Sequence, residues 1–277
     1  VALGQLGSCS VQLQEVTTRS PPYHHIKYQL LPMFLVPGLD CDRLMPLIRR
    51  LMHPAFAPSM PPCLPSVEES AQLLLQQILR VKSSGPYNLL GDSWSGAVVL
   101  QLATLLQSRG LVEVFLLDAA PDTAQQRLTV FTDSSDTFRD SEFLATLLNL
   151  PPTKSKHLSE IPIPCWEEQV QSSWSQVQKE IPVEQSKTTQ QYGPKALSML
   201  RNHLKALTLF QLPEQFEGNV HLFRTREALD SDFCGLKKFC TKNPVIHIME
   251  DETLEEIINN PRTSEIINEN VIFAWNL

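Results

Sequence analysis

The segment Tyr87-Asn-Leu-Leu-Gly91-Asp92-Ser93-Trp94-Ser95-Gly96 places a serine at the tip of a turn between a strand and a helix. Tyr87 to Leu90 form an apolar run that predicts a short buried strand, and apolar residues with helical spacing follow from Ala97. A serine on such a turn stands above the sheet at a helix N-terminus, where free N–H groups and the helix dipole stabilise an oxyanion. The segment predicts a nucleophilic Ser93; the simpler interpretation is an ordinary Gly- and Ser-rich βα turn.

The flanking small residues follow the nucleophile-turn pattern G-x-S-x-G with one departure. Gly91 occupies the first glycine position, but Ser95 stands in place of the second, and Gly96 follows one residue later. Because serine is also small, we expect the strained turn to tolerate it.

The rest of the chain predicts an α/β fold with a mostly parallel central sheet and helices on both faces. Short apolar runs alternate with stretches of helical spacing, and connections of this length join parallel strands. Ser66 and Glu69 form a capping-box signature at the start of one helix. The expected strands are Gln29 to Val36, Tyr87 to Leu90, Val112 to Leu117, Val220 to Phe223 and Pro244 to Met249; the expected helices are Leu44 to Leu51, one opened by Ser66, one from Ala97, and a last one that includes Ile266 to Phe273.

Composition divides the chain into three parts. Residues 1–25 are rich in Ser, Gln, Thr and Pro and are interpreted as a linker from an upstream domain. Residues 26–131 and 218–277 carry the βα pattern of the core. Residues 132–217 lack that pattern, are rich in Gln, Ser and Glu, and are interpreted as a helical insertion. Its aromatic residues line either a ligand channel or, in the simpler interpretation, a small core of their own.

Charge and cysteine usage exclude several kinds of partner. The net charge is −7 over 277 residues, without a run of basic residues, so nucleic acid is not an expected partner. No apolar run approaches the roughly 20 residues of a membrane span. The six cysteines show neither metal-site nor disulfide spacing, which favours reduced thiols in the cytoplasm and predicts no metal.

Two further features lie where a partner of Ser93 is expected. Asp118 ends the strand Val112 to Leu117, and carboxyl ends of parallel strands face one crevice, so it is a candidate acidic partner; an Asp in this place is also a common helix cap. The turn after Val36, Pro37-Gly38-Leu39-Asp40, offers a backbone N–H that could join that of Trp94 in an oxyanion hole, unless it only ends the strand.

These residues together resemble the thioesterase domain of animal fatty acid synthases, a member of the α/β-hydrolase superfamily. The resemblance covers about residues 30–125 and, more weakly, 218–273. It implies an α/β-hydrolase fold with a helical lid over an acyl groove, Ser93 as nucleophile, Asp118 as the residue that orients the base, and Leu39 and Trp94 as oxyanion donors. It also implies a long-chain acyl thioester substrate on the phosphopantetheine of an acyl carrier domain in the same polypeptide, with no cofactor in this domain.

The sequence departs from that family at the catalytic base. The family has a histidine in the loop after the last strand, where this chain has Glu250-Asp-Glu-Thr-Leu254, and it usually has a histidine where Pro37 stands. The nearest histidine is His247, inside the last expected strand. It is the candidate base, and the alternative is a packed or hydrogen-bonded strand residue.

Three hypotheses about function follow. The first is a fatty-acyl thioesterase that works through an acyl-Ser93 intermediate. The second is a catalytically weak or inactive domain that binds acyl chains or docks the carrier. The third is an esterase for a small-molecule ester, because the fold alone does not select the substrate.

Overall fold

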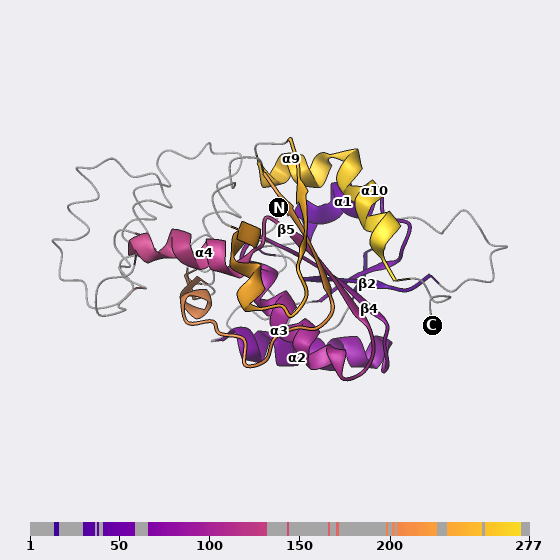
Figure 1. Ribbon diagram of the computed structural model, residues 1–277, viewed down its shortest axis with the longest axis horizontal. Coiled ribbons are helices and arrows are strands. Elements are labelled where there is room, and N and C mark those ends of the chain that lie inside the picture. Colours follow the sequence, from indigo (N-terminus) through magenta and orange to yellow (C-terminus); the bar gives the residue numbers. More distant parts are fainter. Residues whose placement is uncertain are drawn as a thin grey trace.

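The computed structural model describes residues 14–16, 30–36, 38, 41–58, 66–131, 204–225, 232–250 and 253–272, with residues 143, 166, 170, 171, 198, 201 and 202. Its centre is a seven-stranded sheet in the order β1-β3-β2-β4-β5-β6-β7 (Figure 1). All neighbouring strands are parallel except β1 and β3. The strands are β1 Gln14–Glu15, β2 Met33–Val36, β3 Ala55–Ala57, β4 Tyr87–Asp92, β5 Val112–Leu117, β6 Asn219–Arg224 and β7 Val245–Ile248.

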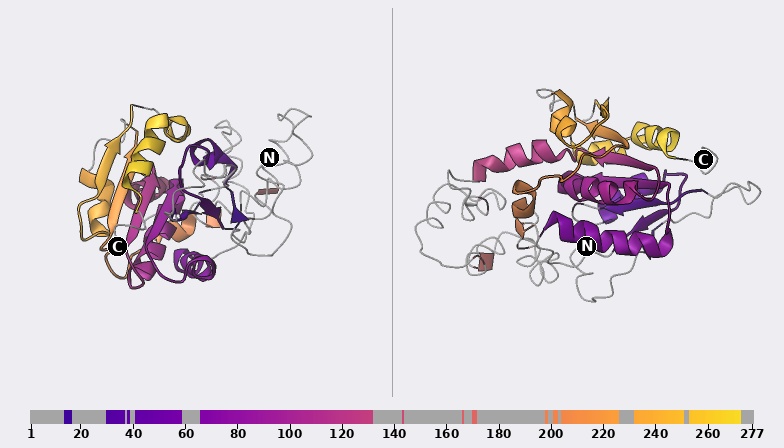
Figure 2. Two further views of the ribbon diagram at one scale, coloured as in Figure 1. Left: turned by 90° about the vertical axis from the view of Figure 1, so that its right-hand side faces the viewer. Right: turned by 60° about the horizontal axis from the view of Figure 1, so that its bottom comes forward.

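Helices cover both faces of this sheet, as the sequence predicted. In Figures 1 and 2, α2 and α3 lie on one side of the strands, while α1, α9 and α10 lie on the other. Helix α4 runs outward from the end of β5 (Figure 1). The helices are η2 Asp42–Leu44, α1 Met45–Ile48, α2 Val67–Val81, η3 Ser93–Ser95, α3 Gly96–Gln107, α4 Pro121–Leu128, η4 Thr129–Phe131, η8 Asp232–Lys238, α9 Leu254–Asn259 and α10 Pro261–Asn270.

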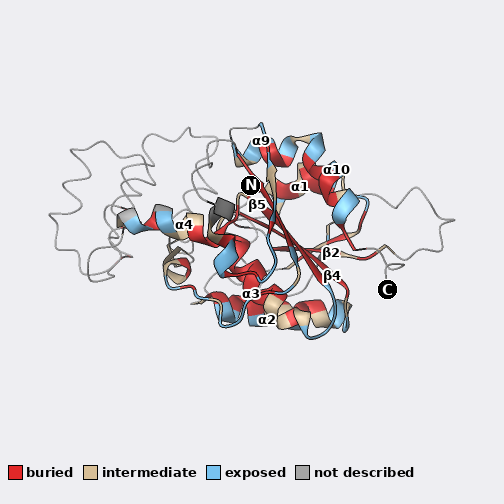
Figure 3. Ribbon diagram, viewed as in Figure 1, coloured by how far each residue is buried: buried red, intermediate tan, exposed pale blue. Residues whose placement is uncertain are grey.

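Each face of the sheet has its own hydrophobic core, and Figure 3 shows the central strands buried between the two. Strand side chains alternate between the faces, so Leu116 of β5 packs with α2 and α3, while Phe115 and Leu117 pack with α1, α9 and α10. Strands buried on both faces read as continuous apolar runs, which explains why β4 and β5 were recognisable in the sequence.

Helix α2 begins where its capping signal predicted. The Ser66 hydroxyl accepts a hydrogen bond from the Glu69 N–H at 3.1 Å, which satisfies one of the N–H groups that the first helical turn leaves open. Ala71, Leu74 and Ile78, at helical spacing, are buried against the sheet.

Three local expectations need correction. The predicted linker contains β1, which pairs with the edge of β3, so the fold starts before residue 26. The segment after Pro54 contains β3, which is absent from the expected strands; its three residues show no strand pattern, and pairing with β2 stabilises it. The last helix, expected to include Ile266 to Phe273, is α10 and ends at Asn270; α9 before it was not predicted, and Pro261, which cannot donate a helical N–H bond, starts α10 as a separate helix.

Most of the predicted insertion lies outside the described residues, but its last part packs on the core. Residues 204–208 are helical, and Leu207 and Phe210 are buried with α3. The Gln125 side-chain amide on α4 donates to the carbonyls of both, at 2.9 Å each.

Two aromatic residues of the insertion are buried against other rings. Phe143 lies between Phe131 and Trp166, with ring centroids 5.5 and 6.4 Å away. Because Phe131 precedes the predicted insertion, this aromatic cluster joins the insertion to the core segment. Trp174 lies outside the described residues.

Candidate active site

Ser93 occupies a strained turn between β4 and α3. Its φ is +53°, in the left-handed region that non-glycine residues rarely adopt, and the chain enters the short helix η3 directly. Such strain places a side chain at the carboxyl end of a strand and beside a helix N-terminus. The backbone of the predicted nucleophile turn is therefore present, with Trp94 as the next residue on η3.

Two glycines are required for this turn to fit. A Cβ at Gly91 would lie 2.5 Å from Val99 Cγ2 and 2.8 Å from Ser95 Oγ. A Cβ at Gly96 would lie 1.7 Å from the Ala119 carbonyl oxygen, so only glycine lets α3 start against the loop that carries Asp118. The glycine that this close backbone approach requires is therefore Gly96, one residue after the second glycine of the G-x-S-x-G pattern.

Asp118 lies at the same edge of the sheet as Ser93. Asp92 pairs with Leu117 in the β4–β5 register, so Ser93 and Asp118 are the first residues beyond that pair. Asp118 also has a positive φ, +47°, while its N–H donates to the Phe223 carbonyl at 2.8 Å. Parallel neighbouring strands are about 4.8 Å apart, which brings the two residues together at the carboxyl edge.

The turn after β2 closes against Ser93 from the other side. The Gly38 N–H donates to Asp92 Oδ1 at 2.6 Å, and a Cβ at Gly38 would lie only 3.2 Å from the Ser93 Cβ. Leu39, the expected oxyanion donor of this turn, and Pro37 lie outside the described residues. No role was predicted for Asp92; the signal that could have indicated one is a charged residue at the end of an apolar strand.

The structure does not bring His247 to this corner. Asp92, Leu117, Phe223 and His247 follow one another in register across β4, β5, β6 and β7, so three strand spacings, about 14 Å, separate the backbones of β4 and β7. His247 is also one residue short of the strand end, inside β7. Its expected role as the base of Ser93 does not agree with this placement.

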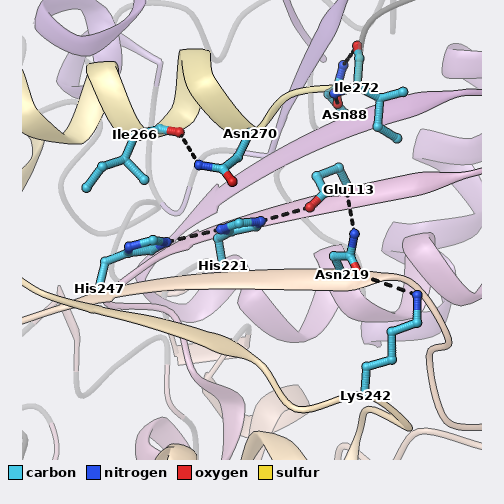
Figure 4. Close-up of polar contacts among 9 residues, drawn as sticks. All are labelled: Asn88, Glu113, Asn219, His221, Lys242, His247, Ile266, Asn270 and Ile272. Atoms are coloured by element: carbon cyan, nitrogen blue, oxygen red, sulfur yellow. Dashed lines mark hydrogen bonds and ion pairs between the residues drawn. The ribbon is translucent and has the colours of Figure 1, made fainter. Parts of the chain in front are cut away.

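His247 instead ends a hydrogen-bonded row of side chains across three strands (Figure 4). His221 Nε2 lies 2.8 Å from Glu113 Oε1, and His221 Nδ1 lies 3.0 Å from His247 Nε2. The Asn219 amide donates to the other Glu113 oxygen at 3.1 Å. We call Glu113, His221 and His247 the histidine row. Glu113 was not predicted as a site residue. The signal that could have indicated it is a single acidic residue within the apolar run of β5.

The hydrogen bonds fix which ring nitrogen carries each proton in the neutral row. A carboxylate only accepts, so His221 Nε2 carries a proton and donates to Glu113. His221 Nδ1 then accepts from His247 Nε2, and His247 Nδ1 has no proton. The two imidazoles stack with centroids 5.3 Å apart, and His247 also stacks on Phe223 at 4.7 Å.

This environment favours neutral His247. Burial, then the charge that His221 carries when it is protonated and the charge of Arg262, lower the pKa of His247 to about 4. His247 is therefore uncharged at neutral pH and has a structural place in the sheet.

His53 does not serve Ser93 either. It is buried, its Nδ1 lies 2.9 Å from the Leu31 carbonyl oxygen, and burial lowers its pKa. Leu31 precedes β2, so this histidine lies at the amino end of the parallel strands, opposite to Ser93. Within the described ranges, no histidine occupies the carboxyl edge beside Ser93. The other four, His24, His25, His157 and His203, lie outside those ranges.

A cavity of about 800 Å³ opens beside α4, the helix that starts three residues after Asp118. Residues 208–212 and η8 form its other walls. Phe210 and Phe239 stack on one another with centroids 5.6 Å apart, and the Lys238 ammonium pairs with the Asp122 carboxylate. The volume lies within the range of small-molecule sites, although Ser93 does not line it.

The described residues give no sign of a metal site. No cluster of three or more His, Cys, Asp or Glu side chains in that part of the chain could hold an ion. Cys41 and Cys240 are thiols rather than halves of a disulfide, and burial raises the pKa of Cys240 to about 12, which keeps it protonated. None of the described helices is long and apolar enough to cross a membrane.

Solved structures that resemble this chain include thioesterase domains. The Vlm2 thioesterase domain bound with a dodecadepsipeptide superposes with a TM-score of 0.61 at 16% identity, covering 94% of this chain and 98% of its own. The NocB thioesterase domain of the nocardicin cluster gives a TM-score of 0.54 at 15% identity, covering 87% and 94%. The chain has the fold of an α/β-hydrolase thioesterase domain.

A larger protein contains the same fold as one part. The four-domain nonribosomal peptide synthetase AB3403 superposes with a TM-score of 0.65 at 16% identity; the match covers 93% of this chain and 20% of the synthetase. No family model matches the sequence. No curated protein matches it either. At these identities the likeness concerns the fold alone.

Proposed function

We propose that this chain is a serine-type thioesterase domain that takes an acyl group from a carrier domain onto Ser93. The observation that carries the proposal is the positive φ of Ser93 at the strand-to-helix turn, with Asp118 directly beyond the paired ends of β4 and β5. Strain of this kind is retained where it serves a site. The thioesterase fold of the chain adds support.

The chemistry would proceed in two steps. The Ser93 oxygen attacks the thioester carbonyl, the C–S bond breaks, and the serine proton passes through a base to the leaving thiolate. Water then attacks the acyl ester, which releases the carboxylic acid and restores Ser93. Backbone N–H groups of Trp94 and Leu39 would stabilise the oxyanion in both steps.

For the substrate we propose a long-chain acyl thioester on the phosphopantetheine of an acyl carrier domain in the same polypeptide, in the cytoplasm. The support is the resemblance of residues 30–125 to fatty acid synthase thioesterases. The cavity beside α4 has a mixed lining, in which Leu209 and Leu212 are the apolar residues that a chain could contact beside the stacked Phe210 and Phe239.

A fluorophosphonate probe tests the serine without a choice of substrate. We expect the full chain to be labelled at Ser93 and Ser93→Ala to stay unlabelled. Hydrolysis rates of palmitoyl thioesters and of matched oxygen esters then separate a thioesterase from an esterase. A folded chain that the probe does not label would contradict the proposal.

A second function is favoured by one observation: no histidine in the described residues lies at the carboxyl edge beside Ser93. General-base catalysis by histidine contributes about 10²- to 10⁴-fold to such reactions. Without it, the domain would bind acyl chains or hold the carrier with little turnover. Mass spectrometry of the chain with an acyl thioester decides: an acyl adduct or tight binding without released acid supports this second function.

A further inference from the structure

Asp92, the residue directly before the proposed nucleophile, is buried and polar at the place where two turns meet. The whole residue is 1% exposed. Burial of a carboxylate is costly, so the protein must gain from its contacts. Those contacts join the nucleophile turn to the turn after β2.

The first contact runs to Gly38. The Gly38 N–H donates to Asp92 Oδ1 at 2.6 Å, a short hydrogen bond between a backbone amide and a carboxylate. Such charge-assisted bonds are about twice as strong as neutral ones. Gly38 directly precedes Leu39, whose N–H is the proposed oxyanion donor.

The second contact runs to Ser95. Its buried hydroxyl accepts from the Asp92 N–H at 3.0 Å and donates to the Asp92 carbonyl at 2.8 Å. Residue 95 is the place where the G-x-S-x-G pattern has a glycine, which has no hydroxyl to make these bonds. Ser95 therefore fixes the Asp92 backbone on one side of Ser93, while Gly38 fixes its side chain on the other.

The spacing between the turns leaves little room for adjustment. A Cβ at Gly38 would lie 2.9 Å from the Asp92 carbonyl oxygen and 3.2 Å from the Ser93 Cβ. Gly38 therefore lies close against the nucleophile turn, and its hydrogen bond to the Asp92 carboxylate sets the direction of the Gly38 N–H.

We propose that Asp92 is a positioning residue that holds the Gly38 turn against the Ser93 turn and so sets the geometry of the oxyanion hole. The proposal deepens the proposed function and rests on it for the catalytic consequence. Asp92 does not touch the reacting atoms in this role. Oxyanion-hole donors must lie within a few tenths of an ångström of their productive positions, so a small loosening of this turn has a large effect on rate.

The test compares Asp92→Ala and Asp92→Asn in the full chain by two measurements. The first is fluorophosphonate labelling of Ser93, resolved into the maximal rate and the concentration for half-maximal rate. The second is amide hydrogen exchange of Gly38, followed by NMR. We expect Asp92→Ala to lower the maximal rate at least 10-fold, with the half-maximal concentration unchanged, and to speed Gly38 exchange at least 10-fold. Asn keeps an oxygen that accepts from Gly38, so it should restore both values to within about 5-fold of wild type.

Glu113→Ala is the matched control, because it also removes a buried carboxylate from a strand, but on β5 and away from Ser93. It should lower stability and leave the labelling rate and Gly38 exchange unchanged. If it slows labelling as much as Asp92→Ala does, the effect of Asp92 is general destabilisation and the proposal is overturned.

Two further outcomes are decisive. If wild type is not labelled, the proposed function fails, and Gly38 exchange alone judges the contact: faster exchange in Asp92→Ala supports it and unchanged exchange overturns it. If Asp92→Ala does not fold, Gly38→Ala reaches the same contact from the other turn, because its Cβ must push the turns apart. Slower labelling and faster exchange at residue 38 then support the proposal, and unchanged values overturn it.

Discussion

Two clusters in this molecule each contain part of an acid–histidine–serine arrangement. The carboxyl edge of the sheet has Ser93 and Asp118, both at positive φ, and no histidine within the described residues. The histidine row has Glu113, His221 and His247 in hydrogen-bond contact across the sheet, and no serine. The first has the backbone of a reactive site, and the second has the side chains of a proton relay.

Their positions in the strands explain the difference. Ser93 and Asp118 lie just beyond the last paired residues of β4 and β5, where side chains are released from the sheet. The histidine row lies within paired strands, where alternate side chains pack under α9 and α10. Residue type alone does not make a site: Ser93 and Asp118 lie beyond the paired residues of their strands, whereas His221 and His247 lie within theirs.

The largest expected effect separates the two clusters by reactivity. Ser93→Ala should abolish fluorophosphonate labelling, whereas His247→Gln should leave its rate within about 2-fold of wild type. Gln keeps a donor for His221 Nδ1, so the row retains its hydrogen bond. Intact-mass spectra over time give both rates. Loss of labelling in His247→Gln, with the fold preserved, would restore His247 as the base and contradict its placement here.

Gly96→Ala is expected to damage the carboxyl edge alone. The new Cβ would meet the Ala119 carbonyl oxygen at 1.7 Å, and a backbone atom cannot rotate away. Overpacking of this kind costs about 3 kcal/mol of unfolding free energy, more than the helix gains from replacing glycine. Urea unfolding measures the loss, with Thr104→Ala on the same helix as the control. An unchanged midpoint would show that α3 can shift away from the Asp118 loop.

The histidine row is expected to matter for stability through its buried carboxylate. His221→Leu removes the partner of Glu113 Oε1 and should cost about 2 kcal/mol, because a buried charged acceptor loses a hydrogen bond. The double variant Glu113→Leu, His221→Leu removes the charge as well and should recover part of that loss. The free energies of unfolding in urea of the wild type, both single variants and the double variant form a double-mutant cycle. Additive losses would mean that the two side chains contribute independently.

The sequence predicted the fold well because the strands that decide it are buried on both faces. β4, β5 and β6 are apolar runs whose positions agree with the structure to within two residues, and Ser66 caps α2 as its spacing indicated. The edge elements β1 and β3 were missed, since two or three residues carry no periodic pattern and their pairing is a tertiary effect.

The candidate site was predictable only in part for a related reason. Motif spacing located the Ser93 turn, and strand order placed Asp118 beside it, because both depend on local sequence. The contacts of Asp92 with Gly38 and of Glu113 with His221 join residues 54 and 108 positions apart, and no local pattern encodes them. In the sequence His247 lies close to the loop where the base was expected. The β6–β7 register and the alternation of side chains in β7 instead place its ring against His221, in the histidine row.

The smallest expected effect is a pH dependence of stability that belongs to the row. His247 has a folded pKa of about 4, below its ordinary value of 6.5, so the unfolded chain takes up its proton first as pH falls. The contribution of His247 is complete above pH 6.5 and is lost as pH falls from 6.5 towards 4.

The full shift corresponds to about 3 kcal/mol, but the ring is half-buried and solvent screening leaves about 1 kcal/mol. The difference between the unfolding free energies at pH 7.5 and pH 5, measured with urea, should therefore be smaller in His247→Gln than in wild type by about 1 kcal/mol. The same slope in both proteins would assign the acid sensitivity to other groups, and His247 would then be an ordinary half-exposed residue on an edge strand.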